Sequence, residues 1–461
     1  MRDLFLIGFL FSLFAMGLRR PFLMVLVYIY IDIVAPQRLT YYLLNTVPIS
    51  LIAVIAAVGG WALVDDKRDS RFTVRQGAIL LLLAYCALTT FFGADFPAQA
   101  KDKWDWVWKA LAFAVFLPLT LRTRLRIEAL LLFMILSISS IVIIGGIKTL
   151  FSGGGYGELN LIVSNNTGLY EGSIISTVAV AVVPIILWFM RRGTIYPPDW
   201  RVRAFGAGLI FACLLIPVGT SARTGLLCVV LLAVLMLRDV KRRLLYIGLL
   251  AAAGMAVVPL LPSSYTQRMN TIRGYQGDES ASTRLAVWKW TLGYVASNPF
   301  GGGFNAYLQN SFRYDLTMVE GSAQDKTIQQ KVTTDRARAY HSSYFEMLGE
   351  QGWPGLFLWL GINISGLLRM ESLRRRYRKA DDPLHWGGQL AGALQHAHLI
   401  YLLGGAFVGI AYNPFLYQLI AAQIGLDTYL SRKSREARLK PVAGRQPPPK
   451  SGSVRTFAPS A

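Results

Sequence analysis

The sequence predicts an all-α polytopic integral membrane protein with about twelve transmembrane helices and a large, partly helical loop on the outer side. Apolar residues make up 54% of the 461 residues. They gather in uninterrupted runs from Leu4 to Leu430, separated by short charged segments. Only helices or closed barrels satisfy every backbone group in lipid. Because the runs are too long and too uniform for the alternating strands of a barrel, we expect helices.

The expected spans follow these apolar runs in order. They cover 4–18, 22–35, 46–64, 77–93, 106–121, 127–150, 173–190, 204–219, 225–237, 244–261, 354–369, 389–410 and 414–430. The first two runs are short for separate crossings, since one crossing needs about 20 residues. They form either two tilted helices or one shallow hairpin, so we expect twelve spans or thirteen and favour twelve. The side of the N-terminus stays open.

Basic residues gather in clusters between the apolar runs. The formal charge of +21 therefore indicates membrane topology and argues against nucleic-acid binding. Lys and Arg mark the cytoplasmic side, and their alternation makes the C-terminus cytoplasmic. The clusters lie at 65–71, 122–126, 191–203, 238–243, 374–379 and 432–440. The loop 152–172 contains no Lys or Arg and falls outside.

The chain shows no sign of a cleavable signal peptide, because Arg19 and Arg20 follow the first apolar run in place of a small-residue cleavage site. Cys86, Cys213 and Cys228 all lie inside apolar runs. Packing accounts for them, and nothing about their placement indicates a disulfide or a metal site.

Four regions follow from this topology. Residues 1–261 hold transmembrane helices one to ten, and 354–430 hold the C-terminal transmembrane helices. Residues 262–353 form a large outer loop, periplasmic in a Gram-negative cell, which is too long to be a mere connector. Residues 431–461 form a basic cytoplasmic tail, which we expect to be disordered from its Pro and Ser content.

The turn TSARTG at 220–225 lies between two apolar spans on the outer side. It places Arg223 near the membrane face, flanked by small hydroxyl residues. An arginine at this depth also snorkels to lipid headgroups, so the turn alone favours no chemistry.

A second signal is the stretch 282–307 in the large loop. Arg284 and Trp288 are four residues apart, so they share one face of a helix. The mixture of Val, Trp and Leu with charge also fits an interfacial helix without chemistry. The glycines at 301–303 end this helix and permit a tight turn. Without a Walker or dinucleotide pattern they are weak support for phosphate binding.

The third signal is His341, which lies in the outer loop directly before an apolar helix. Histidine is the side chain best suited to move protons near neutral pH. A structural histidine at a helix start is an equal alternative. Of the other three, His385 is on the cytoplasmic side, and His396 and His398 lie within a span, where packing or hydrogen bonding explains them better than catalysis.

Together the three signals resemble the C-terminal half of the O-antigen ligase and O-antigen polymerase superfamily. The family pattern has an S-x-R turn, an R-x-x-x-W helix leading into P-x-G-x-G, and a final H-[NS]-x-[YF] stretch that ends in E-x-G-x-x-G. Here these read Ser221–Arg223, Arg284–Trp288, Pro299–Gly301–Gly303, and His341–Ser342–Tyr344 with Glu350, Gly352 and Gly355. The order, the spacing and the expected topology all fit.

The N-terminal part adds to this resemblance. The opening segment 1–22 and the stretch 36–39 are similar to the ligase-type subgroup associated with exosortase systems. One departure is Ser342, where many members carry Asn or a second His. That departure removes the basis for assigning a role to this position.

The resemblance implies a metal-independent, inverting glycosyltransferase of the bacterial inner membrane, which acts in lipopolysaccharide biosynthesis. Its donor would be undecaprenyl diphosphate-linked O-antigen and its acceptor lipid A–core oligosaccharide. It implies that Arg223 and Arg284 bind the diphosphate, since guanidinium groups match phosphate oxygens and stay charged. His341 would take the proton of the acceptor hydroxyl.

Five further residues are candidates for supporting roles at this site. They are Ser221, Trp288, Asn305, Arg338 and Tyr344. We expect no cofactor and no metal, because the outer loops show no Asp-x-Asp pair to hold one. Besides the donor and the acceptor, the expected partner is the lipid bilayer.

Other functions stay open at this point. An O-antigen polymerase or a protein O-oligosaccharyltransferase of the same superfamily shares the donor chemistry. A polysaccharide transporter or flippase is a different class, but the spans carry few charged residues to line a pathway. A structural scaffold would leave the arginine and histidine set unexplained.

Overall fold

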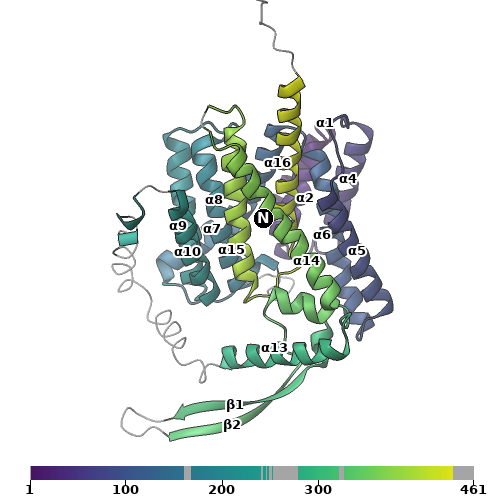
Figure 1. Ribbon diagram of the computed structural model, residues 1–461, viewed down its shortest axis with the longest axis vertical. Coiled ribbons are helices and arrows are strands. Elements are labelled where there is room, and N and C mark those ends of the chain that lie inside the picture. The colour runs from purple at the N-terminus through teal and green to yellow at the C-terminus, as the bar shows by residue number, and fades with distance from the viewer. Residues whose placement is uncertain are drawn as a thin grey trace, which may run out of the picture.

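The computed structural model describes residues 2–159, 168–239, 242–245, 247–248, 252, 279–320, 327–379 and 381–439. In this part of the chain nearly every element is a helix, and the one sheet has two strands (Figure 1). The predicted helical membrane class is confirmed at this level. The predicted span 244–261 lies mostly outside the described residues, as do 262–278 of the predicted loop.

The helices are α1 (Arg2–Arg19), α2 (Phe22–Val34), α3 (Pro36–Leu39), α4 (Ile49–Leu63), α5 (Val74–Phe92), α6 (Pro97–Thr120), α7 (Arg124–Ser152), α8 (Gly172–Arg192), α9 (Trp200–Gly219), α10 (Arg223–Met236), α13 (Glu279–Ser297), α14 (Ser343–Arg376), α15 (His385–Gly405) and α16 (Pro414–Leu439). Within the described residues, 5 of them, namely α5, α7, α8, α9 and α14, are long and apolar enough to cross a membrane. Helices α2, α4 and α10 are apolar but shorter. The expected number of spans therefore stays a prediction.

The N-terminal pair forms a helical hairpin. The carboxylate of Asp3, at the start of α1, accepts hydrogen bonds from the backbone N–H groups of Tyr41 and Tyr42, at 3.0 and 3.3 Å from Oδ2. These residues follow α2 and α3, so α1 and α2 run antiparallel. Helix α2 is buried over most of its length, which explains why its sequence is apolar on every face.

Helix α8 lies at the centre of the bundle and packs against α15, α9 and α10. Its side chains are buried on nearly every face, which suits an almost wholly apolar sequence. Near its first turns, Thr177 packs directly against Gly404 of α15, and Ser176 Oγ lies 2.9 Å from Thr220 Oγ1 after α9. These contacts join the start of α8 to the ends of α9 and α15.

The helix bounds differ most from the sequence prediction at α14, α6 and α16. Helix α14 covers Ser343–Arg376 in place of the expected 354–369. Helix α6 begins at Pro97, well before the expected start at 106, because Lys103 packs inside the protein against two carboxylates of α14. Helix α16 continues to Leu439, so residues 431–439 extend a helix and are not part of a disordered tail. Here Arg432 donates to the carbonyl of Arg122 at 2.5 Å. Residues 440–461 lie outside the described residues.

The large loop contains an element that was not predicted. Strands β1 (Ser311–Glu320) and β2 (Thr327–Arg336) pair antiparallel, with Ser311 opposite Arg336 and Glu320 opposite Thr327. The hairpin and α13 lie together at one end of the bundle (Figure 1). The predicted helical part of the loop is present as α13.

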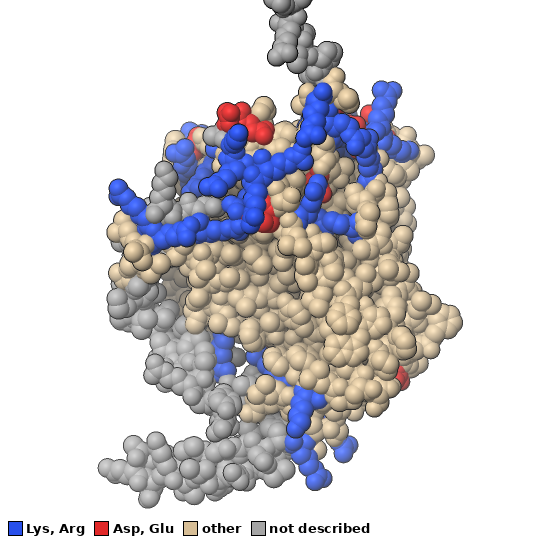
Figure 2. All heavy atoms as spheres, viewed as in Figure 1, with Lys and Arg blue, Asp and Glu red and all other residues tan. Residues whose placement is uncertain are grey.

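The basic clusters gather at the other end, where α16 ends (Figure 2). Contacts between clusters that are far apart in sequence support this arrangement. The contacts are Arg124 Nη2 to the Arg192 carbonyl at 2.9 Å, Arg238 to Glu371 at 2.8 Å, Arg376 to Ser434 at 3.0 Å and Arg432 to Asp69 at 3.1 Å. One end of the molecule therefore carries the side chains that the positive-inside rule assigns to the cytoplasm.

We predict that the end with α13 and the hairpin faces outward. Single cysteines replacing exposed Arg313 on β1 and exposed Arg435 on α16 test this in intact spheroplasts with a membrane-impermeant maleimide. Arg313→Cys should be labelled at once, and Arg435→Cys only after permeabilisation. The native cysteines are buried, so the unsubstituted protein gives the background. Labelling in the reverse order would contradict the topology.

Candidate active site

The turn between α9 and α10 positions Arg223 as the first residue of α10. Ser221 adopts a left-handed backbone conformation, with φ of 52°, which reverses the chain tightly between the two helices. Thr220 anchors the turn through its hydroxyl contact with Ser176 of α8. Because α9 begins and α10 ends at the basic end of the bundle, this turn and Arg223 lie at the opposite end.

Helix α13 is fixed over the residues that precede α14 by Trp288. The indole Nε1 donates to the carbonyl of Tyr340 at 2.9 Å. The ring also stacks on Phe345, with centroids 4.9 Å apart and planes inclined by 5°. Arg284 lies one turn before Trp288 on the same helical face. The four-residue spacing therefore directs the arginine toward the segment that holds His341.

The glycine segment after α13 fits against a break in α14. Gly301 has φ of 77° and Gly352 has φ of 62°, and a side chain at Gly301 would meet the backbone N of Gly352 at 2.5 Å. The N–H of Gly303 donates to the Glu350 carbonyl at 2.9 Å. These backbone groups bind α14, so the two glycine motifs form one structural joint and not a phosphate-binding loop.

His341 lies directly before α14, with its backbone strained at φ of 47°. Partial burial and the positive charges of Arg284 and Arg338 lower the pKa of His341 below its ordinary value. The His341 side chain is still exposed to solvent. A side chain that contacts a substrate needs this exposure. The second charge that acts on the imidazole is that of Arg338, which the sequence offered as a supporting candidate. The pairing of Arg284 with Arg223 at the diphosphate stays a prediction.

Arg338 is held in place by Asn310, a residue that the sequence analysis missed. The fully buried Asn310 amide accepts from the Arg338 N–H at 3.0 Å and donates to the Arg338 carbonyl at 2.7 Å. The Arg338 side chain also contacts Asp335. No sequence pattern marked Asn310, because its burial depends on a strand that was not predicted; in the structure the buried amide is satisfied by backbone partners.

Asn305 and Tyr344 face the interior of the fold. The backbone N–H of Asn305 donates to Glu350 Oε1 at 3.0 Å, and its amide donates to the Gln99 carbonyl at 2.8 Å. Tyr344 donates to the Leu402 carbonyl at 3.1 Å. Both residues therefore form hydrogen bonds within the fold, and their supporting role at the site stays a prediction.

A buried ion-pair network lies under the site and was also missed. Lys103 Nζ of α6 lies 2.7 Å from Glu346 Oε1 and 2.9 Å from Glu350 Oε1. Glu350 is fully buried, and Glu346 also accepts from the Ala411 N–H at 3.0 Å. Two acids four residues apart on one helix face were the sequence signal, because buried carboxylates require a cation. In the described part of the chain no group of three or more His, Cys, Asp or Glu is arranged to hold a metal.

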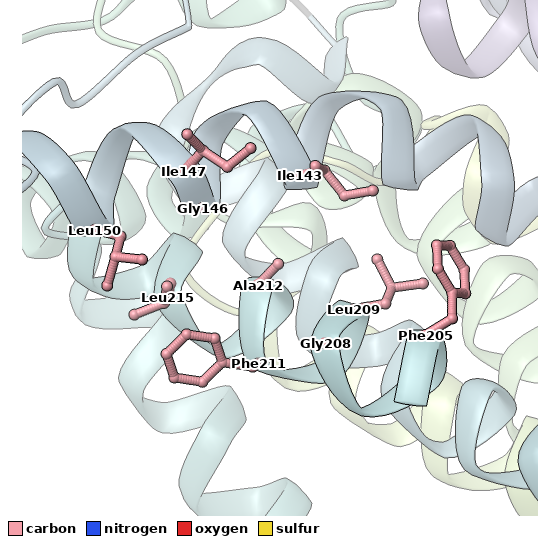
Figure 3. Close-up of a pocket in the computed structure, with 10 residues that line it drawn as sticks. All are labelled: Ile143, Gly146, Ile147, Leu150, Phe205, Gly208, Leu209, Phe211, Ala212 and Leu215. Atoms are coloured by element: carbon pink, nitrogen blue, oxygen red, sulfur yellow. The ribbon is translucent and has the colours of Figure 1, made fainter. Parts of the chain in front are cut away.

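An apolar cavity of about 300 Å³ opens between α7 and α9 (Figure 3). Its walls are hydrocarbon, including Ile147 and Leu150 of α7 and Phe211 and Leu215 of α9. The latter two residues lie in the half of α9 that leads to the Ser221 turn. A cavity of this kind suits a hydrocarbon chain.

The fold and the site define a polytopic helical membrane protein with a histidine and arginines at one end. Residues 207–360 match the family described as O-Antigen ligase, and residues 1–194 match a family of unknown function, DUF5935. No curated protein matches the chain. The ligase match covers most of α9, all of α10, α13 and the hairpin, and about half of α14, so the predicted resemblance to the O-antigen ligase superfamily is confirmed there. The exosortase-associated subgroup stays a prediction.

We predict that Lys103→Met destabilises the protein, because it leaves two carboxylates buried without their cation. The expected loss is about 3–5 kcal/mol of folding free energy, seen as a lower midpoint of thermal unfolding in detergent. Lys101→Met, two residues earlier on the same helix and exposed, should change stability by less than about 0.5 kcal/mol. Equal midpoints for the two variants would contradict a structural role for the network.

The lowered pKa of His341 gives a second prediction. With ¹³C-labelled histidine, the His341 imidazole signal should titrate below the ordinary value of about 6.5. The Arg338→Gln variant removes a nearby positive charge, so the pKa should rise toward that value. Arg336→Gln, at an exposed position two residues earlier, serves as the control. The signal is assigned by its loss in His341→Gln. An Arg338→Gln titration that matches the unsubstituted protein would refute the charge coupling.

Proposed function

We propose that the protein is an O-antigen ligase-like glycosyltransferase. In this proposal it moves a glycan from undecaprenyl diphosphate to lipid A–core oligosaccharide in lipopolysaccharide biosynthesis. The reaction takes place on the periplasmic side of the inner membrane, and the C-terminus is cytoplasmic. The supporting observation is the placement of Arg284 and Arg338 beside His341, inside the stretch that matches the O-antigen ligase family.

The charges at this site fit a lipid-linked donor. A diphosphate at the membrane face is an anion, and guanidinium groups bind phosphate oxygens with two parallel hydrogen bonds. The outer compartment lacks nucleotide sugars, so a glycosyl donor there must be attached to a lipid. In the proposal Arg223 and Arg284 bind the diphosphate. The apolar cavity between α7 and α9 accepts the hydrocarbon chain of the lipid.

The proposed chemical step is a single displacement. The acceptor oxygen attacks the anomeric carbon, and the bond from that carbon to the diphosphate oxygen breaks with its electron pair leaving on the diphosphate. His341 takes the acceptor proton, for which it must be neutral. The nearby positive charges favour that neutral form. Attack opposite the leaving group inverts the anomeric carbon.

The arginines also stabilise the leaving group. Negative charge on the diphosphate grows as the glycosidic bond breaks, and fixed cations aimed at it lower the barrier. This role is the one that a divalent cation fills in many other transferases. We therefore propose that the reaction is metal-independent and that EDTA leaves its rate unchanged.

The deciding test is transfer by the purified full-length protein from a lipid-linked O-antigen to three separate acceptors. Lipid A–core should be glycosylated. Product on a free glycan repeat would indicate a polymerase, and product on a pilin-type peptide would indicate a protein O-oligosaccharyltransferase. No transfer to any acceptor, with the donor moved across proteoliposome membranes, would instead support a flippase.

We predict that Arg223→Ala and Arg284→Ala each lower turnover on the order of a hundredfold or more, since each removes a charged contact to the diphosphate. Replacement by Lys should rescue only part, because an ammonium does not form a two-pronged contact. Arg313→Ala, an exposed arginine on β1, is the matched control. Full turnover of either alanine variant would remove that residue from the site.

We predict that His341→Ala lowers turnover by ~100- to 10,000-fold, the usual contribution of a general base. Binding of the donor should persist, because the arginines hold it. Donor affinity and turnover are measured on the same preparation. A parallel loss of both would identify His341 as a binding residue and leave the base to be sought elsewhere.

A further inference from the structure

The basic end of the bundle holds a second cavity, far along the helices from the His341 site. Its volume is about 970 Å³, and its walls come from α8, α10, α14 and α15. This size falls in the range of ligand sites. The cavity has no part in the transferase proposal, so what it binds is a separate question.

Four arginines line this cavity, and no Asp or Glu is among its described lining residues. They are Arg191 and Arg192 at the end of α8, and Arg374 and Arg378 at or just beyond the end of α14. Arg191, Arg192 and Arg378 make no side-chain ion pair or hydrogen bond with any described residue. Basic residues are common at helix C-termini because they complement the helix dipole. That preference explains the arginines but does not explain the cavity that they line.

Glu371, which pairs with the lining residue Arg374, does not neutralise this charge. Glu371 pairs with Arg374 at 3.0 Å, with Arg375 at 2.5 Å and with Arg238 at 2.8 Å. One carboxylate thus serves three guanidinium groups. The cavity keeps a positive potential that an anion would relieve.

The His385 ring joins α15 to the end of α14 at the edge of the cavity. The His385 ring lies with Nδ1 3.0 Å from the Tyr377 carbonyl and Nε2 3.0 Å from the Gln389 amide. His385 therefore ties the end of α14 to α15, and the arginines supply the charge.

Much of the remaining wall is apolar, and Tyr377, Gln389 and His396 add polar groups to it. Pro184 and Leu187 of α8, Leu235 and Met236 of α10, and Ala393 of α15 line the cavity below the arginines. A free phosphate ion is much smaller than about 970 Å³ and gains nothing from hydrocarbon walls. A molecule with an anionic head and an apolar body matches both kinds of wall.

We propose that this cavity binds an anionic phospholipid, with its phosphate among Arg191, Arg192, Arg374 and Arg378 and its acyl region against α8 and α10. Basic pockets between membrane helices on the cytoplasmic side are suited to such headgroups. The site joins the ends of four helices, so an occupied cavity holds the basic end of the bundle together.

The test uses the purified full-length protein in neutral detergent, with phosphatidylglycerol, phosphatidylcholine and inorganic phosphate as separate probes. Phosphatidylglycerol should raise the thermal unfolding midpoint, and the other two should not. The double variant Arg191→Gln/Arg378→Gln should bind phosphatidylglycerol on the order of tenfold more weakly or worse. The matched control, Arg203→Gln/Arg435→Gln, removes two arginines from the same end outside the cavity lining and should respond like the unsubstituted protein.

The outcomes separate the sources of the anion. An equal shift with inorganic phosphate would overturn the lipid in favour of a phosphate site, and an equal shift with phosphatidylcholine would overturn the need for an anionic head. An unchanged response of the cavity variant would overturn the site. A photoreactive phosphatidylglycerol labels the unsubstituted protein independently of any variant. It should label peptides from 184–192 and 385–393, and their absence among labelled peptides would also overturn the proposal.

Discussion

The position of the catalytic candidates depends on the buried ion-pair network that joins Lys103 of α6 to Glu346 and Glu350 of α14. Removing charged groups from water is costly, and the cost is offset only when the partners are in contact. Glu350 meets Lys103 and also receives the Asn305 N–H, so the pair fixes the segment that follows α13. Because α13 carries Arg284, the approach of that arginine to His341 relies on a lysine far from it in sequence.

Much of the fold follows from the sequence, because a membrane span needs a long apolar run and the chain supplies many of them. The prediction failed where charged residues are buried and where polar segments form regular structure. The charged first turns of α6 resemble a loop, yet Lys103 is enclosed by its acids. Strand β1 does alternate apolar and polar residues from Phe312 to Met318, and the prediction overlooked this pattern. Its partner β2 is polar along most of its length and carries no such pattern.

The order of the site residues was predictable, but their neighbours were not. Helical spacing alone places Arg284 and Trp288 on one face. The structure shows that this face contacts the segment before α14, where Trp288 donates to the Tyr340 carbonyl. The charge of Arg338 lowers the pKa of His341, and Asn310 holds the Arg338 backbone across the base of the hairpin. That contact joins residues on both sides of a hairpin whose pairing the sequence did not reveal.

Backbone strain gives the last link between the fold and the proposed chemistry. Among the described residues, the non-glycine positions with positive φ are Ala35, Ser221, Asn305, Ala337 and His341. Three of them are predicted site residues, and a fourth precedes Arg338. Each such conformation costs on the order of 1–3 kcal/mol and persists only where surrounding contacts determine it. The contacts of Thr220, Glu350 and Asn310 do this here. The free-energy cost of orienting the arginines and the histidine is therefore part of folding. The groups do not have to reorient during the reaction, as electrostatic catalysis by preorganised groups requires.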